Sequence, residues 1–504
     1  MSWKNWRRVR QAVQITSFVI YIYLIFSVVE RRVAPALSDI FFRLDPLAAA
    51  GAMLASRSWI PKLGLALVTV GLTLLIGRVW CGWMCPLGSL LEWVSFKNAR
   101  RRSASISPRW RLAKYFLLAV SLSAAIFGVL TWLVFDPIAI FTRTLTTAIL
   151  PALFYAVNAV ETALYRVDFL SPALDGFEML VRGTLIPVEQ PAFSQSLVIV
   201  GMFTGILALN LLAHRFWCRY LCPLGALLGL LSKVSLFRPL IGSACTQCTR
   251  CAVVCKPGAV DTNPQNFHIM PSECTVCLDC FANCKPGDIR FGFSVKPAPH
   301  QEFDLSRRQA LGALATGAAG VLLLGTELRV QQDNPWRIRP PGVNDEGTFL
   351  STCIRCSQCM KICPTTALQP ALMEAGLAGL WTPLVAPRVG YCDYGCTACG
   401  QVCPSGAIPK LPLEEKRQAV IGKASIDRNR CLPWASGQPC IVCEEMCPTP
   451  QKAIRLEEAQ VTDANGEVTT VQRPSVYRDL CIGCGICEHY CPLQGTAAIR
   501  VYDA

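Results

Sequence analysis

Cysteine spacing is the feature of this sequence that most directly predicts chemistry. There are 28 cysteines among 504 residues; most fall into six groups of four, and two pairs remain. Groups one, two, three and six have the C-x2-C-x2-C-x3-C run of bacterial ferredoxins, whereas group four opens with three intervening residues and group five with eight. In chain order the six groups are Cys245, Cys248, Cys251 and Cys255; Cys274, Cys277, Cys280 and Cys284; Cys353, Cys356, Cys359 and Cys363; Cys392, Cys396, Cys399 and Cys403; Cys431, Cys440, Cys443 and Cys447; and Cys481, Cys484, Cys487 and Cys491. Three thiolates on one tight loop can reach three corners of an iron–sulfur cube, so we expect six 4Fe–4S clusters.

The fourth cysteine of each ferredoxin group usually ligates the other cluster of a pair. This rule joins Cys245, Cys248 and Cys251 to Cys284, and Cys274, Cys277 and Cys280 to Cys255. For groups three to six we favour nested pairing, group three with six and four with five, over sequential pairing. The alternatives to iron are disulfides, which belong to small secreted domains, and structural zinc, whose sites rarely show the triple run.

The two remaining pairs lie in an internal repeat. The stretch from Arg78 to Leu91 recurs from Arg215 to Leu228, and each copy contains C-x3-C-P. The dipeptide Asp-Pro also recurs, at Asp45 and at Asp136. This recurrence suggests a parallel repeat with a pseudo-two-fold axis along the membrane normal. Two half-motifs that face each other would supply four thiolates to one site. We therefore expect that an additional iron–sulfur centre or iron ion is held by Cys81, Cys85, Cys218 and Cys222; buried packing thiols or a redox disulfide are the alternatives.

Composition indicates a membrane protein. Only 16% of residues are charged, 52% are hydrophobic, and the mean hydropathy is +0.37. The uncharged apolar stretches of near-spanning length are 11–29, 63–77 (continuing to 80), 115–135 and 190–213. Residues 144–160 are also uncharged, but Pro151 interrupts them, and we interpret them as an interfacial or re-entrant helix.

Lysine and arginine residues predict the orientation of these spans. They are dense before the first span and between residues 78 and 114, and sparse between 136 and 189. The positive-inside rule then places the N-terminus, the second loop and the segment after Ala213 in the cytoplasm. A fifth apolar stretch, 309–326, follows Ser306-Arg307-Arg308 and has the pattern of a twin-arginine export signal, or simply of a span with basic flanks. Both interpretations put groups one and two in the cytoplasm and groups three to six in the periplasm of a bacterial inner membrane.

The formal net charge of +14 does not indicate nucleic-acid binding. That charge counts every cysteine as neutral, whereas a four-cysteine 4Fe–4S centre carries about −2 overall. Six such centres bring the chain close to neutrality.

Together these patterns predict a multi-domain membrane protein. We expect a four-helix transmembrane domain with an internal repeat at 1–239, and a ferredoxin-like α+β domain with two 4Fe–4S clusters at 240–300. A fifth transmembrane anchor at 301–328 and a polyferredoxin α+β domain with four 4Fe–4S clusters at 329–504 would follow.

The motifs resemble those of quinol-dehydrogenase ferredoxin proteins. Residues 1–300, with four spans, two C-x3-C-P motifs and two ferredoxin groups, look like NapH; residues 304–504 look like NapG; the MauN and MauM proteins form a similar pair. The fusion in one chain is a departure from that pattern. The resemblance implies electron transfer from membrane quinol to a periplasmic cytochrome or reductase, alongside other respiratory subunits. It also allows a different role, in which the chain supplies electrons for the maturation of a periplasmic enzyme.

Quinol oxidation needs a proton acceptor. The candidates are His214, Glu92, Asp45 and Asp136; alternatively, the first two lie at headgroup level and the aspartates only cap helices. No C-x-x-C-H occurs, there are only four histidines, and there is no convincing Rossmann or P-loop fingerprint. Haem, nicotinamide and flavin chemistry are therefore not expected on this chain. Three cations near cysteines could raise cluster potentials: Arg355, Lys361 and Arg430.

Overall fold

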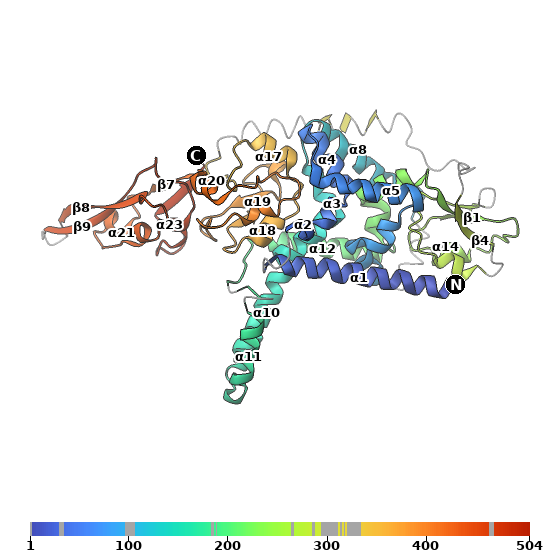
Figure 1. The fold of residues 1–504 in the computed structure, drawn as a ribbon, viewed down its shortest axis with the longest axis horizontal. Coiled ribbons are helices and arrows are strands. Elements are labelled where there is room, and N and C mark those ends of the chain that lie inside the picture. Colours follow the sequence, from blue (N-terminus) through green and yellow to red (C-terminus); the bar gives the residue numbers. More distant parts are fainter. Residues whose placement is uncertain are drawn as a thin grey trace. The chain divides into compact units, whose positions relative to one another are not determined.

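The computed structural model describes residues 3–29, 35–95, 106–182, 186–187, 189–263, 267–284, 288–293, 311–312, 315–316, 318–319, 334–462 and 468–503. Two compact units make up the chain (Figure 1). One contains residues 1–145 and 197–323, and the other contains 146–196 and 324–504. Residues 146–196, expected inside the first domain, thus group with the C-terminal residues.

The first unit is built mainly from apolar helices. Asp45 and Asp136 cap the helices α4 and α9, and a proline follows each of them at the first helical position, where it lacks only an N–H that would be unpaired anyway. The recurring Asp-Pro dipeptide therefore marks the N-terminus of a helix in both halves of the repeat. The longer helices are α1 (Trp3–Val29), α4 (Pro46–Ser56), α5 (Ala66–Ile76), α6 (Pro86–Trp93), α8 (Leu112–Ile126), α9 (Pro137–Thr144), α12 (Ser196–Ala208) and α13 (Pro223–Ser232). Shorter turns are α2 (Pro35–Ser38), α3 (Ile40–Arg43), η1 (Pro61–Leu65), η2 (Trp80–Met84), η3 (Pro108–Arg111), η4 (Thr131–Phe135), η7 (Leu209–Leu211) and η8 (Trp217–Leu221).

Two helices in the described residues are long and apolar enough to cross a membrane. The first, Asn5–Phe26, matches the first expected span, whereas the second, Pro137–Leu164, contains the residues expected as an interfacial or re-entrant helix. The expected spans 63–77 and 190–213 correspond to the shorter apolar helices Pro61–Ile76 and Ser196–Leu211, and the span 115–135 corresponds to α8. In the second candidate 78% of the apolar window is buried inside the structure, as it is in a core helix of a soluble protein. The four-span arrangement therefore stays a prediction. The expected fifth helix lies outside the described residues except for 311–312, 315–316 and 318–319, which are helical.

Pro151 does not interrupt the helix in which it lies. The π-helical turn η5 (Leu145–Ile149) continues α9 directly into α10 (Leu150–Leu164), and Pro151 occupies the start of α10. A proline is tolerated in a first helical turn, and a π-type turn changes the hydrogen-bond register locally. Residues 144–160, expected as a separate interfacial helix, thus belong to one longer helix.

A small α+β module completes the first unit. Strand β1 (Phe237–Ile241) pairs antiparallel with β4 (Ile289–Phe293). Strand β2 (Val260–Asp261) pairs antiparallel with β3 (His268–Ile269). The helices α14 (Arg250–Val254) and α15 (Asp279–Asn283) contain cysteines, and an apolar core that includes Cys251, Cys274 and Cys280 holds the module together.

The second unit repeats this α+β design on a larger scale. In its described residues, three antiparallel strand pairs are joined by short helices, and a common core contains cysteines from groups three to six. The strand pairs are β5 (Leu368–Pro370) with β6 (Pro383–Val385), β7 (Lys423–Ile426) with β10 (Ile499–Tyr502), and β8 (Ile454–Thr462) with β9 (Val468–Val476). The helices are α17 (Glu346–Thr352), α18 (Gln358–Ile362), α19 (Ala398–Gln401), α20 (Leu413–Gln418), α21 (Leu432–Ala435), α22 (Val442–Glu445) and α23 (Ile486–His489), with the turn η9 (Leu377–Gly379).

Residues 146–196 contact this C-terminal part directly. Helix α10 is followed by η6 (Asp168–Leu170) and α11 (Ser171–Val181). Within this stretch, Arg182 forms ion pairs with Glu161 of α10 at 2.7 Å and with Glu178 of α11 at 2.8 Å. The side-chain amide of Gln369 donates to Ala192 O at 2.9 Å and accepts from Ser194 N at 3.0 Å. The stretch that leads into α12 is thereby hydrogen-bonded to strand β5.

Candidate functional site

The ferredoxin-type cysteine loops share a backbone conformation that side chains rarely adopt. In groups one to three, the residue two after the first cysteine and the residue after the second both have positive φ; they are Gln247, Thr249, Val276, Leu278, Arg355 and Ser357. Group six has Gly483 and Gly485 at these positions. A non-glycine residue in this region costs about 1–3 kcal/mol, and alternating turns of this kind direct backbone N–H groups toward an anion. The loops are therefore shaped for an anionic group such as a thiolate-bound cluster.

Backbone amides also point at the sulfurs. Ala259 N donates to Cys255 Sγ at 3.1 Å, and Ala424 N donates to Cys481 Sγ at 3.4 Å. Hydrogen bonds to a ligating sulfur are one of the means by which a protein tunes an iron–sulfur site.

In the first unit, the structure brings group two together with the last cysteine of group one. The thiol of Cys280 interacts with those of Cys274, Cys277 and Cys255. In group one, Cys251 interacts with Cys245 and Cys248, and Cys284 packs against the core that contains Cys251. Both arrangements agree with the exchange of fourth cysteines that ferredoxin spacing predicts.

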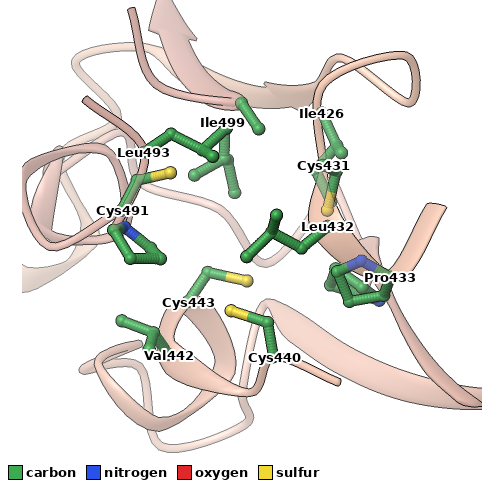
Figure 2. A pocket seen from close by; sticks show the side chains of 13 residues that line it. Ile426, Cys431, Leu432, Pro433, Cys440, Val442, Cys443, Cys491, Leu493 and Ile499 are labelled. Carbon is green, nitrogen blue, oxygen red and sulfur yellow. The ribbon is translucent and has the colours of Figure 1, made fainter. Parts of the chain in front are cut away.

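In the second unit, four sets of four thiols form. Figure 2 shows one of them around a pocket, with sulfurs contributed by Cys431, Cys440, Cys443 and Cys491. We name the four sets A to D. They are set A (Cys353, Cys356, Cys359 and Cys403), set B (Cys363, Cys392, Cys396 and Cys399), set C (Cys447, Cys481, Cys484 and Cys487) and set D (Cys431, Cys440, Cys443 and Cys491).

These sets differ from the nested pairing that we expected. Group three exchanges its fourth cysteine with group four, and group five exchanges with group six, so the pairing is sequential. The reason is local packing. The short helices α18 and α19 of groups three and four contact each other, as do α22 and α23 of groups five and six.

The sets fit a 4Fe–4S cluster. Sets B, C and D each line a pocket that is bordered by thiols and apolar side chains. Within the described residues, no three His, Cys, Asp or Glu side chains are arranged around a single metal ion. Burial first, and then neighbouring thiols, raise the pKa of Cys399, Cys443 and Cys484 to about 12. A positively charged iron group between the thiols would stabilise the thiolates that ligation needs.

The four sets form a row. Cys359 of set A interacts with Cys399 of set B. Cys392 N of set B donates to Cys484 O of set C at 2.8 Å, and Cys487 of set C interacts with Cys443 of set D. The order A, B, C, D thus places each site beside the next, an arrangement that suits stepwise electron transfer.

The two C-x3-C-P motifs have matching local structures. Each begins with a π-helical turn, η2 or η8, and each second cysteine caps the next helix, with Cys85 Sγ accepting from Gly88 N at 3.4 Å and Cys222 Sγ from Gly225 N at 3.2 Å. Cys222 interacts with the other three thiols of the two motifs, namely Cys218, Cys81 and Cys85. The repeats therefore face each other, and the four thiols of Cys81, Cys85, Cys218 and Cys222 (the paired-loop thiols) gather at one place.

Two of the four candidate proton acceptors lie together. The carboxyl groups of Asp45 and Asp136 are buried and interact directly. One oxygen of each accepts capping hydrogen bonds, and the Oδ2 of each has no donor partner among the described residues. Two contacting carboxyl groups satisfy each other only when they share a proton. The Oδ1 atoms of both aspartates therefore cap helices, as the alternative interpretation expected. Their Oδ2 atoms remain available to share a proton.

Glu92 is a poor proton acceptor in this structure. It forms ion pairs with Lys256 at 2.6 Å, with Arg215 at 3.6 Å and with Arg10. Although burial acts in the opposite direction, these cations lower the pKa of Glu92 to about 2. A carboxylate with that pKa does not take up protons near neutral pH, so the structure argues against our expectation for Glu92. His214 is buried beside the second repeat.

The three cations expected near clusters occupy different environments. Arg355 is fully buried and donates to Cys353 O at 3.1 Å, Ala378 O at 2.6 Å and Leu380 O at 3.0 Å. Lys361 is half-buried and Arg430 is exposed. Arg355 is thus the cation held firmly beside a cysteine loop.

Comparison with known proteins agrees with these sites. A family described as "4Fe-4S binding domain" matches residues 61–104 and 195–243, which contain the two C-x3-C-P motifs, and a second family of the same description matches residues 474–494. The ferredoxin-type protein NapG of Escherichia coli is 35% identical over 198 residues, which are 38% of this chain and 83% of that protein. The chain belongs to the NapG and MauM family of ferredoxin-type proteins.

Other members are similarly close. The methylamine utilization ferredoxin-type protein MauM of Methylorubrum extorquens is 36% identical over 39% of this chain and 88% of its own length. The ferredoxin-type protein NapF of Escherichia coli is 30% identical over 32% of this chain and 84% of its own length. No solved structure matches. Family membership and the thiol sets together identify the chain as an iron–sulfur electron-transfer protein.

Sequence reasoning missed the roles of Arg78 and Arg215. Both are buried, and both interact with paired-loop thiols: Arg78 with Cys81 and Cys222, and Arg215 with Cys218, Cys81 and Cys85. A signal was available, because each arginine precedes its first motif cysteine by three residues at the end of an apolar stretch. A charge that recurs at equivalent positions of a membrane-type repeat indicates a functional partner.

Proposed function

We propose that this protein transfers electrons from membrane quinol through 4Fe–4S clusters to a periplasmic redox partner, such as a cytochrome or terminal reductase. The observation that carries the proposal is the row of thiol sets A to D, in which each site adjoins the next. A row of this kind suits stepwise one-electron transfer, whereas sensing would need fewer sites. Six clusters are proposed in all, two in the first unit and four in the second.

The membrane topology is part of this proposal. The positive-inside pattern supports a cytoplasmic location for groups one and two and a periplasmic location for groups three to six. The hydrogen bonds between Gln369 and the stretch before α12 support the same topology, because that stretch lies at the predicted periplasmic end of a span.

Asp45 and Asp136 are the proposed acceptors for protons that quinol releases. Both carboxyl groups are buried, each caps a helix at an equivalent position of the repeat, and the two interact. Tyr21 interacts electrostatically both with Asp136 of this carboxyl pair and with Cys85 of the paired-loop thiols. The pair therefore lies close to thiols that are candidates to receive the electrons.

Reduction by a quinol analogue tests the proposal. In membranes or nanodiscs under anaerobic conditions, reduced menadiol or duroquinol should reduce the clusters of the wild-type chain, as followed by their visible absorbance. Asp136→Asn keeps a good helix cap, and its rate of reduction by quinol should fall by roughly 100-fold, as is typical when a general base is lost. Its reduction by dithionite, which delivers no quinol protons, should be unchanged.

Asp168 provides the matched control, because Asp168→Asn removes an exposed carboxylate to which no role in proton or electron transfer is assigned. If quinol reduces no cluster in an iron-loaded wild-type chain, electron transfer from quinol is wrong, and the maturation role becomes the better description. If Asp136→Asn and wild type are reduced by quinol at the same rate, the proton-acceptor role is wrong.

A further inference from the structure

The first C-x3-C-P loop lies directly on a ferredoxin cysteine loop of the same unit. Gly82 stands between Cys81 and Cys85, and Thr275 stands between Cys274 and Cys277. A Cβ atom added to Gly82 would lie 2.3 Å from Thr275 O. No side chain fits in that space, so glycine is required for the approach.

Hydrogen bonds hold this contact in place. The indole Nε1 of Trp83, the next residue, donates to Val276 O at 3.1 Å. Gln14 Nε2 donates to Gly82 O at 2.8 Å from helix α1. The backbone of the Cys81–Cys85 loop is thus held against the backbone of the Cys274–Cys277 loop.

The second C-x3-C-P loop approaches the same ferredoxin site from another segment. Arg219, which corresponds in position to Gly82, packs against Gly258, where an added Cβ would lie 2.3 Å from its Nη2. Arg219 also interacts electrostatically with Cys255. Cys255 is the thiol that joins Cys274, Cys277 and Cys280, so both repeats contact one thiol set.

Two buried arginines cross between the repeats at this place. Arg215 donates from Nη2 to Cys81 O at 2.7 Å and lies 3.9 Å from Cys218 Sγ, so it touches both motifs. Arg78 interacts with Cys81 of its own repeat and Cys222 of the other, and donates from Nη1 to Ser272 O at 2.6 Å. Two cations buried beside four thiols match the charge of about −2 that a four-cysteine 4Fe–4S centre carries.

We propose that the paired-loop thiols, Cys81, Cys85, Cys218 and Cys222, hold a redox-active iron–sulfur centre that exchanges electrons directly with the site of Cys255, Cys274, Cys277 and Cys280 through the Gly82–Thr275 contact. In each exchange one electron leaves the iron at one thiol set and reduces the iron at the other; no bond forms or breaks and no proton moves. The inference rests on the proposed function, since it connects the paired-loop thiols with one of the two clusters proposed for the first unit. Glycine at 82 and the Trp83 hydrogen bond determine how closely the two sites approach.

Iron analysis and EPR spectroscopy of the whole chain, purified anaerobically and reduced with dithionite, test the proposal without quinol. Wild type should show a signal from the additional centre and a spin–spin splitting between it and a neighbouring cluster. Cys218→Ser should lose that signal, the splitting and the corresponding iron, while the other clusters remain. Gly82→Ala should keep the iron but lose or narrow the splitting, because the added methyl group separates the two loops.

Gly71→Ala is the matched control, since an added Cβ at that position in helix α5 meets no atom within 4 Å. It should leave the iron content and the splitting as in wild type. If Gly82→Ala fails to assemble, Trp83→Phe replaces it, because a smaller aromatic ring remains while the hydrogen bond to Val276 is lost. A narrower splitting is again expected.

Two results would overturn the proposal. Full iron and unchanged signals in Cys218→Ser would show that the paired-loop thiols hold no centre. An unchanged splitting in both Gly82→Ala and Trp83→Phe would show that the contact does not couple the sites. Because dithionite is the reductant, neither result depends on whether quinol is the electron donor.

Discussion

Arg355 shows how a single residue can shape a cluster site. It occupies one of the two left-handed positions in the loop of set A, and its guanidinium is fully buried against three backbone carbonyls. Burial lowers the pKa of Arg355 to about 10, with Cys353 acting in the opposite direction, so the side chain stays charged at neutral pH. A buried positive charge beside a cluster favours its reduced, more negative state.

Removing this charge should lower the reduction potential of set A. A unit charge at roughly 8 Å with an effective dielectric constant of about 20 is worth on the order of 2 kcal/mol, which corresponds to a shift of roughly 90 mV. We expect Arg355→Gln to lower the potential by that order in an EPR-monitored redox titration. Arg355→Lys, which keeps the charge, should shift it less, and Arg430→Gln, at an exposed position, should leave it nearly unchanged. Equal potentials in Arg355→Gln and wild type would contradict this role.

At the scale of elements, short helices position the thiols. Helix α17 ends directly before Cys353, and its N-cap Asp345 accepts a hydrogen bond from Thr348 N at 2.6 Å. Hydrogen bonding with the Thr348 side chain first, and then with its backbone N–H, holds the pKa of Asp345 below its usual value. A carboxylate with a lowered native pKa stabilises the fold above its unfolded-state pKa of about 3.9, and the contribution disappears as the pH falls through the native value.

Asp345→Ala should therefore loosen α17 at neutral pH. Loss of an N-cap costs about 1 kcal/mol, which corresponds to a roughly fivefold faster hydrogen–deuterium exchange of the α17 amides. Asp345→Asn, which still caps, should exchange nearly as wild type does. The difference between Asp345→Ala and wild type should shrink as the pH falls below about 4. A difference that persists there would mean that the charged cap is not its cause.

At the scale of the whole molecule, the fourth cysteines decide which segments share a cluster. Sequential exchange makes two double sites out of groups three to six, and the contact between Cys392 and Cys484 joins those double sites into one row. A nested arrangement would instead have interleaved the two halves of the second unit. The sequential arrangement allows each half to assemble from one continuous stretch of chain.

The iron content of anaerobically purified protein checks this arrangement. Six 4Fe–4S clusters require about 24 iron atoms per chain with as many acid-labile sulfides, and a paired-loop centre raises the count. Cys403→Ser and Cys353→Ser should lose the same cluster, whereas Cys484→Ser should lose a different one. If Cys403→Ser instead removed the cluster of Cys392 and Cys396, the sequential pairing would be wrong.

The cysteine groups could be recognised from sequence alone, because three ligands of each cluster lie on one short loop and their spacing is a local property. The Asp-Pro pairs at Asp45 and Asp136, which begin α4 and α9, are also local features of the sequence. Pro151 was misinterpreted, since a π-helical turn before it keeps the helix continuous. The partner of each fourth cysteine depends on which helices pack together, so only the folded chain decided between nested and sequential pairing. The contact of Trp83 with Val276 joins residues 193 positions apart. No local pattern encodes such a contact; the packing of both repeats against one ferredoxin module determines it.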